Sequence, residues 1–203
     1  MEKKVSDHRA SPFALLLLFC VPLFFWGLRP QAAQAAEAET GKAAWSFLTG
    51  YGTSHPGMGA TRIRVETIDL VTRYERVLAE NLGSSWYRGA HSFLLELPLH
   101  LMVKPDRAAM VGLNFLACWT FTGHGVLQPY LFAGGGPLYF ATDVEGMGTR
   151  LNGNYQFGIG LRQRINNNRY LKFEYRFHHV SNGNRKEPND PLNSSKFLLG
   201  VTF

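Results

Sequence analysis

The sequence has little cysteine and, after its first residues, no long apolar run. Its 203 residues include two cysteines, Cys20 and Cys118. Cys20 lies in a segment that we expect to be removed, so the mature chain cannot form an intrachain disulfide. After residue 35, no stretch approaches the roughly 20 apolar residues that a transmembrane helix needs. The net charge is only +6 and no basic run is interleaved with aromatic residues, which excludes the pattern typical of nucleic-acid binding.

The N-terminal segment has the features of a secretory signal peptide. Basic residues precede an apolar run at 13–28, and Ala33-Gln34-Ala35 supplies a cleavage site of small residues. A membrane anchor is the alternative, because the run approaches the length at which the two are hard to distinguish. Pro22 interrupts the run, however, and the cleavage site follows closely. We therefore expect a cleaved signal peptide at 1–35 and a single mature domain at 36–203.

Segments of alternating polarity, separated by turn residues, fill the rest of the chain. Between residues 155 and 164, for example, aromatic and aliphatic side chains occupy one face, and glycine, glutamine and arginine occupy the other. Eight such segments can be recognised, at 43–53, 61–76, 93–101, 111–121, 126–141, 155–164, 170–181 and 196–203. In the second segment the pattern slips near residues 67–69, which we interpret as a β-bulge.

Alternation would also suit a soluble β-sandwich, so the choice depends on what each face carries. One face holds more charges than a dry core tolerates unless they pair in a polar lumen. These residues are Arg64, Glu66, Glu96, Arg162, Arg164, Lys172, Glu174 and Arg176. The other face is apolar and would promote aggregation in water. We therefore predict an all-β fold, an eight-stranded antiparallel transmembrane β-barrel of the outer membrane, with a lumen filled by side chains.

The segment at 170–181 combines this barrel pattern with possible chemistry. Its apolar face ends in His179 and Ser181, which share a face because they are two residues apart. On a wall that faces lipid, such a base and hydroxyl could attack a lipid ester. If both chain ends are periplasmic, this seventh strand runs outward and places the pair at the outer leaflet, which is lipopolysaccharide in a Gram-negative outer membrane. His178 points to the opposite face, so His178 and His179 are a poor metal site, and no metal is expected.

The residues around this pair resemble the active-site region of a known family. The sequence His179-Val180-Ser181-Asn182, followed by Pro188-Asn189-Asp190 and Asn193, is similar to that of the lipid A 3-O-deacylase (PagL), or acyloxyacyl hydrolase, family of outer-membrane proteins. The resemblance implies an esterase that removes the 3-O-linked acyl chain of lipid A in lipopolysaccharide without a cofactor. It further implies that Ser181 is the nucleophile, His179 the general base and Asn182 the oxyanion-hole donor. The terminal Phe203 resembles the signal by which the barrel-assembly machinery recognises such barrels.

Asn193 is a departure from the family pattern, because the best-known deacylases have a glutamate there to orient the histidine. If the last strand extends that far, Asn193 points outward across the hairpin from His179, and its amide oxygen can accept the histidine N–H. An amide cannot stabilise an imidazolium as a carboxylate does, and the Asp-to-Asn change in a trypsin-like triad costs about 10⁴ in rate. Asp190 and Glu187 are nearby loop carboxylates that could substitute.

Two other functions agree with the same sequence. One is a non-catalytic barrel, structural or adhesive, that has lost efficient catalysis together with the carboxylate. The other is a phospholipase A-type lipid hydrolase, because the outer-membrane phospholipase A family uses a Ser–His–Asn set on another barrel. The oligomeric state stays open between a monomer and a homodimer.

Overall fold

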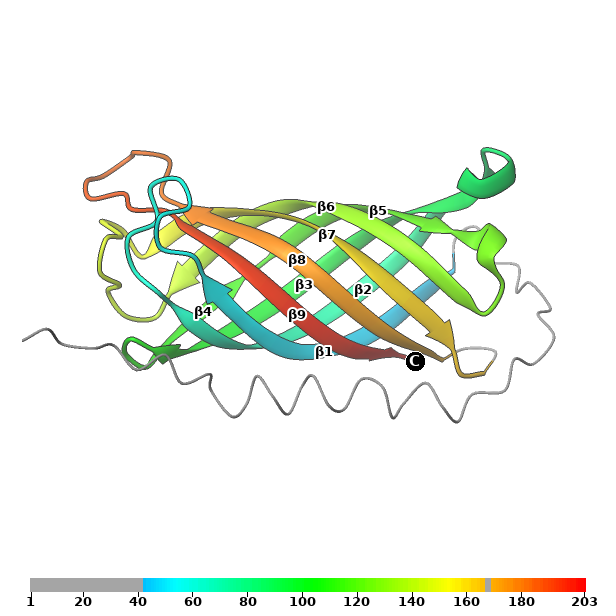
Figure 1. Cartoon of the computed structure of the whole chain (residues 1–203), viewed down its shortest axis with the longest axis horizontal. Helices are drawn as coiled ribbons and strands as arrows, with labels where there is room; N and C mark the ends of the chain where they lie inside the picture. The colour runs from blue at the N-terminus through cyan, green and yellow to red at the C-terminus, as the bar shows by residue number, and fades with distance from the viewer. Residues whose placement is uncertain (1–41, 167–168) are drawn as a thin grey trace, which may run out of the picture. The chain divides into compact units, whose positions relative to one another are not determined.

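A computed structural model describes residues 42–166 and 169–203, and the expected signal peptide at 1–35 lies outside this part. The described chain is an antiparallel sheet that closes on itself (Figure 1). Its strands are β1 (Ala43–Ser54), β2 (Glu66–Leu82), β3 (Gly89–Lys104), β4 (Ala108–Gly112), β5 (Asn114–Phe121), β6 (Leu127–Phe140), β7 (Leu151–Arg164), β8 (Tyr170–Ser181) and β9 (Leu192–Thr202). Two short 3₁₀ turns, η1 (Ser85–Tyr87) and η2 (Thr122–His124), lie between strands. Within the described ranges, no helix has the length and apolar character to cross a membrane.

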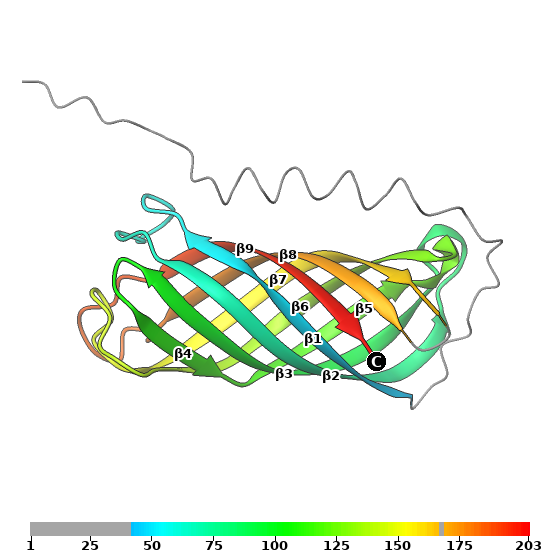
Figure 2. The ribbon, with the colours of Figure 1, turned by 90° about the horizontal axis from the view of Figure 1, so that it is seen from below.

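The nine labelled strands form an eight-stranded ring. Strands β4 and β5 both pair with β3 on one side and β6 on the other, with the same register before and after Leu113, so they are two halves of one strand. Strand β1 closes the ring by pairing with both β2 and β9, and Figure 2 shows it between them. The predicted eight-stranded barrel is confirmed, and closure leaves every strand of the ring paired on both sides.

The prediction for the second strand was partly wrong. Strand β2 begins at Glu66 rather than near residue 61. The expected bulge is not in β2: its pairing with β1 keeps one register from Glu66 to Arg76, and the extra residue opposite the Glu66–Thr67 step is Val103 of β3. Alternation along this part of β2 is therefore continuous, and Thr67 and Asp69 point inward and are buried. Arg64 and Glu66 do not face the lumen as predicted: Arg64 is exposed, and Glu66 pairs with Lys104 at 3.1 Å near the rim.

Burial alternates along the other strands in the predicted sense. Outward side chains are large and apolar, such as Leu97, Phe157 and Ile159, each more than half exposed. Their inward neighbours are buried, and many of them are polar or charged. An apolar belt around a polar lumen is the pattern of a membrane barrel, because the lipid covers the side chains that water would not.

Four fully buried charges hold the middle of the lumen together. Arg73 from β2 contacts Glu96 from β3 at 2.6 Å and Glu174 from β8 at 2.6 Å. Arg176 bridges the same two glutamates, at 3.0 Å to Glu96. Tyr130 from β6 donates a hydrogen bond to Glu174 at 2.6 Å. Because two positive groups meet two negative groups, the cluster carries no net charge, and each strand that contributes to it is tied to the opposite wall.

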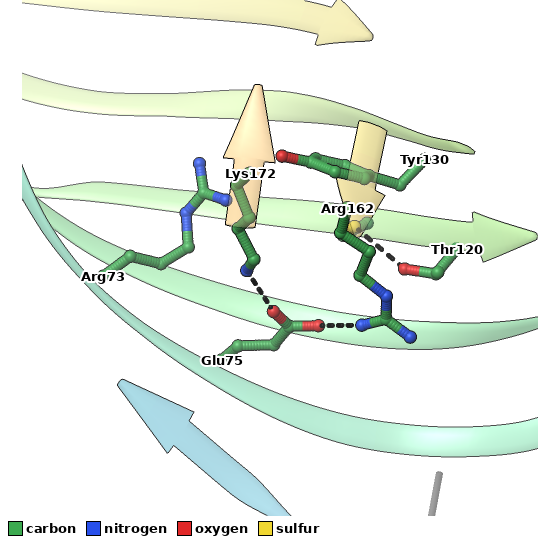
Figure 3. A pocket seen from close by; sticks show the side chains of 7 residues that line it. Arg73, Glu75, Thr120, Tyr130, Arg162 and Lys172 are labelled. Atoms are coloured by element: carbon green, nitrogen blue, oxygen red, sulfur yellow. Dashed lines mark hydrogen bonds and ion pairs between the residues drawn. The ribbon is translucent and has the colours of Figure 1, made fainter. Parts of the chain in front are cut away.

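A second ion-pair group fills the lumen toward the end where the chain terminates. Lys172 contacts Glu75 at 2.9 Å, and Arg162 lies 3.7 Å from the same carboxylate (Figure 3). These side chains line a pocket together with Cys118 and Thr120, and they leave no room for a water molecule. At this level the lumen is filled by side chains, as predicted for a barrel of eight strands.

Removing one member of the four-charge cluster should destabilise the barrel strongly. Glu174→Ala leaves two buried arginines against one glutamate, so we expect a loss of about 3–5 kcal/mol in the free energy of unfolding. Urea unfolding in lipid vesicles, followed by tryptophan fluorescence, measures this loss. Glu66→Ala is the matched control, because its partner Lys104 is largely exposed, and it should cost less than about 1 kcal/mol. Equal losses in the two variants would contradict a stabilising role for the cluster.

Candidate active site

The C-terminal end of β8 lies among the long loops of the barrel. The β1–β2, β6–β7 and β8–β9 loops gather at one end (Figure 1). Strand β8 ends at Ser181, and after a loop at 182–191 the chain returns as β9, which brings Asn193 directly opposite His179. Asn193 is mostly buried, with 8% of its surface exposed. The predicted juxtaposition of His179 and Asn193 is present.

His179 is held by contacts with both neighbouring strands. Its Nδ1 lies 2.7 Å from Asn193 Oδ1 on β9. On the other side, its ring stacks on Tyr155 of β7 with 4.4 Å between ring centroids and 21° between planes. The hydrogen bond fixes one nitrogen and the stack fixes the plane, so the orientation of the imidazole is determined before any ligand binds.

The amide of Asn193 is in turn oriented by the β1–β2 loop. Its Nδ2 donates to the carbonyl of Met58 at 2.9 Å and to Thr61 Oγ1 at 3.0 Å. Both amide hydrogens are used in this way, so the oxygen must be the atom that faces His179. The amide oxygen only accepts, and the proton of the imidazole therefore lies on Nδ1. Nε2 of His179 is left as the basic nitrogen.

The loop that provides these partners is tightly folded against β9. Gly57 and Gly59 have φ values of +89° and +57°, a conformation that favours glycine, and they flank Met58 so that its carbonyl turns toward Asn193. Thr61 is buried and also accepts the backbone N–H of Asn193 at 3.0 Å. Sequence reasoning missed Met58 and Thr61. The closely spaced glycines signal a turn, but they do not reveal which strand the turn packs against.

Ser181 lies at the open edge of this arrangement. It is half-buried, two residues from His179 on the same face, and its partner on β7 is Gly153. A Cβ added at Gly153 would meet only the Ser181 carbonyl, at 3.8 Å, so the neighbouring strand leaves space beside the serine. Within 42–166 and 169–203, no side chain or backbone group forms a hydrogen bond with Ser181 Oγ. The hydroxyl is therefore free to meet a ligand that approaches from the membrane side.

Asn182 lies on the other face and organises the loop. It is buried, its Nδ2 donates to the carbonyls of Lys186 at 2.7 Å and Pro188 at 3.3 Å, and its backbone N–H donates to Asn189 Oδ1 at 2.9 Å. In this conformation the amide hydrogens are used within the loop. The role of oxyanion-hole donor stays a prediction for Asn182, and it requires one of these bonds to be exchanged.

The remaining polar candidates have other positions. Asp190 pairs with Arg62 at 3.1 Å, and Glu187 is exposed, so neither carboxylate takes the place of Asn193 beside His179. His178 is buried in the lumen with its ring centroid 5.3 Å from that of His100, as expected for the inward face.

Comparisons with known proteins agree with the fold and with the family resemblance. The family model described as lipid A 3-O-deacylase (PagL) matches residues 71–202. The structure of the outer membrane enzyme PagL is similar at a TM-score of 0.56 and 18% identity, over 78% of this chain and 98% of that chain. Neisserial surface protein A (NspA) is similar at a TM-score of 0.60 and 12% identity, over 85% of this chain and 98% of that one. At these identities the two structures show a shared fold. No curated protein sequence matches the chain significantly.

The hydrogen-bond chain predicts the tautomer of His179. With ¹⁵N-labelled histidine in detergent micelles, NMR should show the proton of the neutral His179 ring on Nδ1 and none on Nε2. A His179→Gln variant assigns the signal. Thr61→Val removes one acceptor of the Asn193 amide, so the amide can rotate and both tautomers should become populated. A proton found on Nε2 in the parent protein would contradict this orientation of Asn193.

Proposed function

The chain belongs to the lipid A 3-O-deacylase (PagL) family, and we propose that it hydrolyses the 3-O-linked acyl ester of lipid A with Ser181 as nucleophile. One observation carries the proposal: an imidazole oriented through Nδ1 and a serine hydroxyl that has no hydrogen bond within the described residues share the membrane-facing side of β8, two residues apart. A base and a nucleophile in contact with lipid suit an ester whose carbonyl lies at the membrane surface.

The reaction follows from the proton position on His179. Nε2 of His179 takes the proton of Ser181 as Oγ attacks the ester carbonyl, and a tetrahedral intermediate forms. The C–O bond to the sugar then breaks, and the leaving alkoxide takes the proton from His179. Water, deprotonated by the same nitrogen, attacks the acyl carbon of the acyl-enzyme. The bond from this carbon to Ser181 Oγ then breaks, Oγ takes the proton back from His179, and a fatty acid is released. Asn193 keeps Nδ1 protonated through both halves of the reaction.

Asn193 replaces a carboxylate at the cost of electrostatic stabilisation. Its amide dipole aligns the imidazole but does not neutralise the imidazolium that forms. The contacts from Met58 and Thr61 offset part of this loss, because a fixed amide does not have to reorganise when the proton moves. An oxyanion-hole role for Asn182 requires its side chain to leave the carbonyls of Lys186 and Pro188 and to turn from the buried face to the face of Ser181.

The proposed setting is a Gram-negative outer membrane with the site in the outer leaflet. The support is the position of Ser181 at the barrel end where the long loops gather, since outer loops of such barrels are the longer ones. The substrate is then lipopolysaccharide, reached from the surrounding membrane.

A phospholipase A-type hydrolase is the second candidate. The side chains of the site favour it, because Ser181, His179 and Asn193 resemble the Ser–His–Asn set of the outer-membrane phospholipase A family. The two candidates differ in the lipid that loses an acyl chain, so a lipid analysis separates them.

Mass spectra of lipid A test the proposal directly. Cells that express the protein should contain lipid A lighter by one hydroxyacyl chain, and cells with Ser181→Ala at equal outer-membrane abundance should not. A fluorophosphonate probe should label a peptide that contains Ser181 in the parent protein. Identical lipid A spectra with unchanged phospholipids would favour a non-catalytic barrel, and altered phospholipids alone would favour the phospholipase.

The loop contacts to Asn193 predict a kinetic effect of Thr61. Thr61→Val should lower kcat about 5- to 10-fold with little change in KM, because about one hydrogen bond that aligns the base is lost. Thr61→Ser keeps the oxygen and should retain most of the parent rate. A rise in KM alone would indicate a role in substrate binding instead. Folded yield, measured by heat-modifiable gel mobility, has to be equal in both variants.

A further inference from the structure

The aromatic ring beside His179 has a geometry that the proposed reaction can use. Tyr155 of β7 pairs with His179 of β8 across the hairpin, and the two rings stack with 4.4 Å between centroids and 21° between planes. Phe157 and Phe177, the next ring pair along these strands, lie farther apart, at 5.2 Å, and are more tilted, at 31°. The imidazole therefore lies over the face of the Tyr155 ring rather than against its edge.

The contact is made by the ring of Tyr155 and not by its hydroxyl group. Within residues 42–166 and 169–203, no group forms a hydrogen bond with Tyr155 Oη. Tyr155 is 52% exposed and belongs to the apolar face of β7, so the part of its ring that His179 leaves uncovered faces lipid. Tyr155 thus contributes a π face to the site, in a setting where little water screens it.

A ring face distinguishes the two protonation states of His179. The π electrons make the face of an aromatic ring negative, so a cation over it is attracted more strongly than a neutral ring is. The centroid distance of 4.4 Å lies well within the roughly 6 Å over which this attraction acts. Stacking on Tyr155 therefore favours the imidazolium over the neutral imidazole. Because only stronger stabilisation of the charged form lowers the barrier, this preference accelerates a reaction in which His179 gains a proton.

Among the described residues, no anionic group contacts His179. Asn193 of β9 accepts its Nδ1–H at 2.7 Å and is neutral. Asp190, a carboxylate three residues before Asn193, pairs with Arg62 at 3.1 Å. In the part of the chain that the structure describes, the ring of Tyr155 is thus the group in contact with His179 that prefers a positive charge.

We propose that Tyr155 is a positioning residue of the reaction, and that its ring face stabilises the His179 imidazolium that forms when Ser181 attacks the ester. The inference rests on the proposed esterase function of Ser181. When Nε2 takes the proton of Ser181 Oγ, the positive charge spreads over the imidazole ring, which stays stacked on Tyr155. The proton then leaves with the alkoxide of the sugar, and the charge over Tyr155 disappears with it. Asn193 and Tyr155 divide the two roles of a triad carboxylate, since one orients the imidazole and the other stabilises its charge.

Fluorinated phenylalanines at residue 155 test the ring face with little change in its shape. Each fluorine withdraws electron density from the face and weakens its attraction for a cation. Tyr155→Phe should retain most of the parent kcat for lipid A in detergent micelles. Log kcat should then fall steadily with the number of fluorines, to about one-tenth for a pentafluorinated ring, with little change in KM. Phe115, whose outward ring stacks on Phe93 at 6.3 Å and 29°, is the matched control, and the same fluorinated residues there should leave kcat unchanged.

A second measurement on the same proteins needs no turnover. At the pH that protonates half of the His179 rings in the Tyr155→Phe variant, ¹⁵N NMR should show about one-tenth imidazolium in the pentafluorinated variant. A ten-fold loss of stabilisation shifts this equilibrium ten-fold. His55, which contacts Ser195 Oγ at 2.9 Å rather than the ring at residue 155, should keep its protonated fraction and serves as the internal control.

The outcomes separate this inference from the proposed function. If the Tyr155→Phe variant deacylates lipid A and fluorination changes neither kcat nor the imidazolium fraction, the ring acts only through its shape and the inference is overturned. Equal losses of kcat with fluorines at residues 155 and 115 would also overturn it, because the effect would then be a general one on the barrel. A fluorine-dependent imidazolium fraction in a protein that leaves lipid A unchanged would overturn the proposed function, and with it the role of Tyr155 in catalysis.

Discussion

The paired charges of Arg73, Glu96, Glu174 and Arg176 are the interaction on which the rest of the barrel depends. An eight-stranded barrel is too narrow for a water-filled lumen, so its inward side chains must satisfy one another. The four groups do so with full burial and no net charge, and they join β2, β3 and β8 across the lumen. Each partner is costly to bury alone, which makes the arrangement specific for one pairing of the strands.

This inner arrangement also determines what faces the membrane. Side chains alternate along a strand, so a register that puts Arg176 opposite Lys196 inside must put His179 opposite Asn193 outside. A slip of one residue would move His178 to the wall and leave buried charges without partners. The chemistry of the wall is therefore positioned by polar contacts on the opposite side of the same strands, and it needs no rigid loop of its own for His179 and Ser181.

The alternation of side chains was sufficient to predict the barrel and its two faces from the sequence. The contacts that depend on loop conformation could not be predicted. The barrel, the two faces and the opposition of His179 and Asn193 follow from a period of two and from hairpin parity. Arg64 and Glu66 were misplaced because the slip in the pattern was interpreted as a bulge in this segment, whereas β2 alternates without interruption from Glu66 to Arg76 and the extra residue, Val103, lies in β3. The role of Asn182 was predicted from its residue type and the family resemblance. Its inward direction and its hydrogen bonds depend on how residues 183–190 fold back, which the sequence does not show.

The contacts of Met58 and Thr61 explain how an asparagine at residue 193 can orient His179. A carboxylate at residue 193 would bring a second negative oxygen against the Met58 carbonyl, where the amide donates a hydrogen bond at 2.9 Å. The Met58 carbonyl thus matches an amide and repels a carboxylate, whereas the Thr61 hydroxyl can accept from an amide or donate to a carboxylate. Asparagine and loop form one unit: the loop defines which amide atom faces His179, and the asparagine gives the loop a buried partner. The departure from the family pattern at residue 193 therefore changes the group that orients His179 but does not remove this interaction.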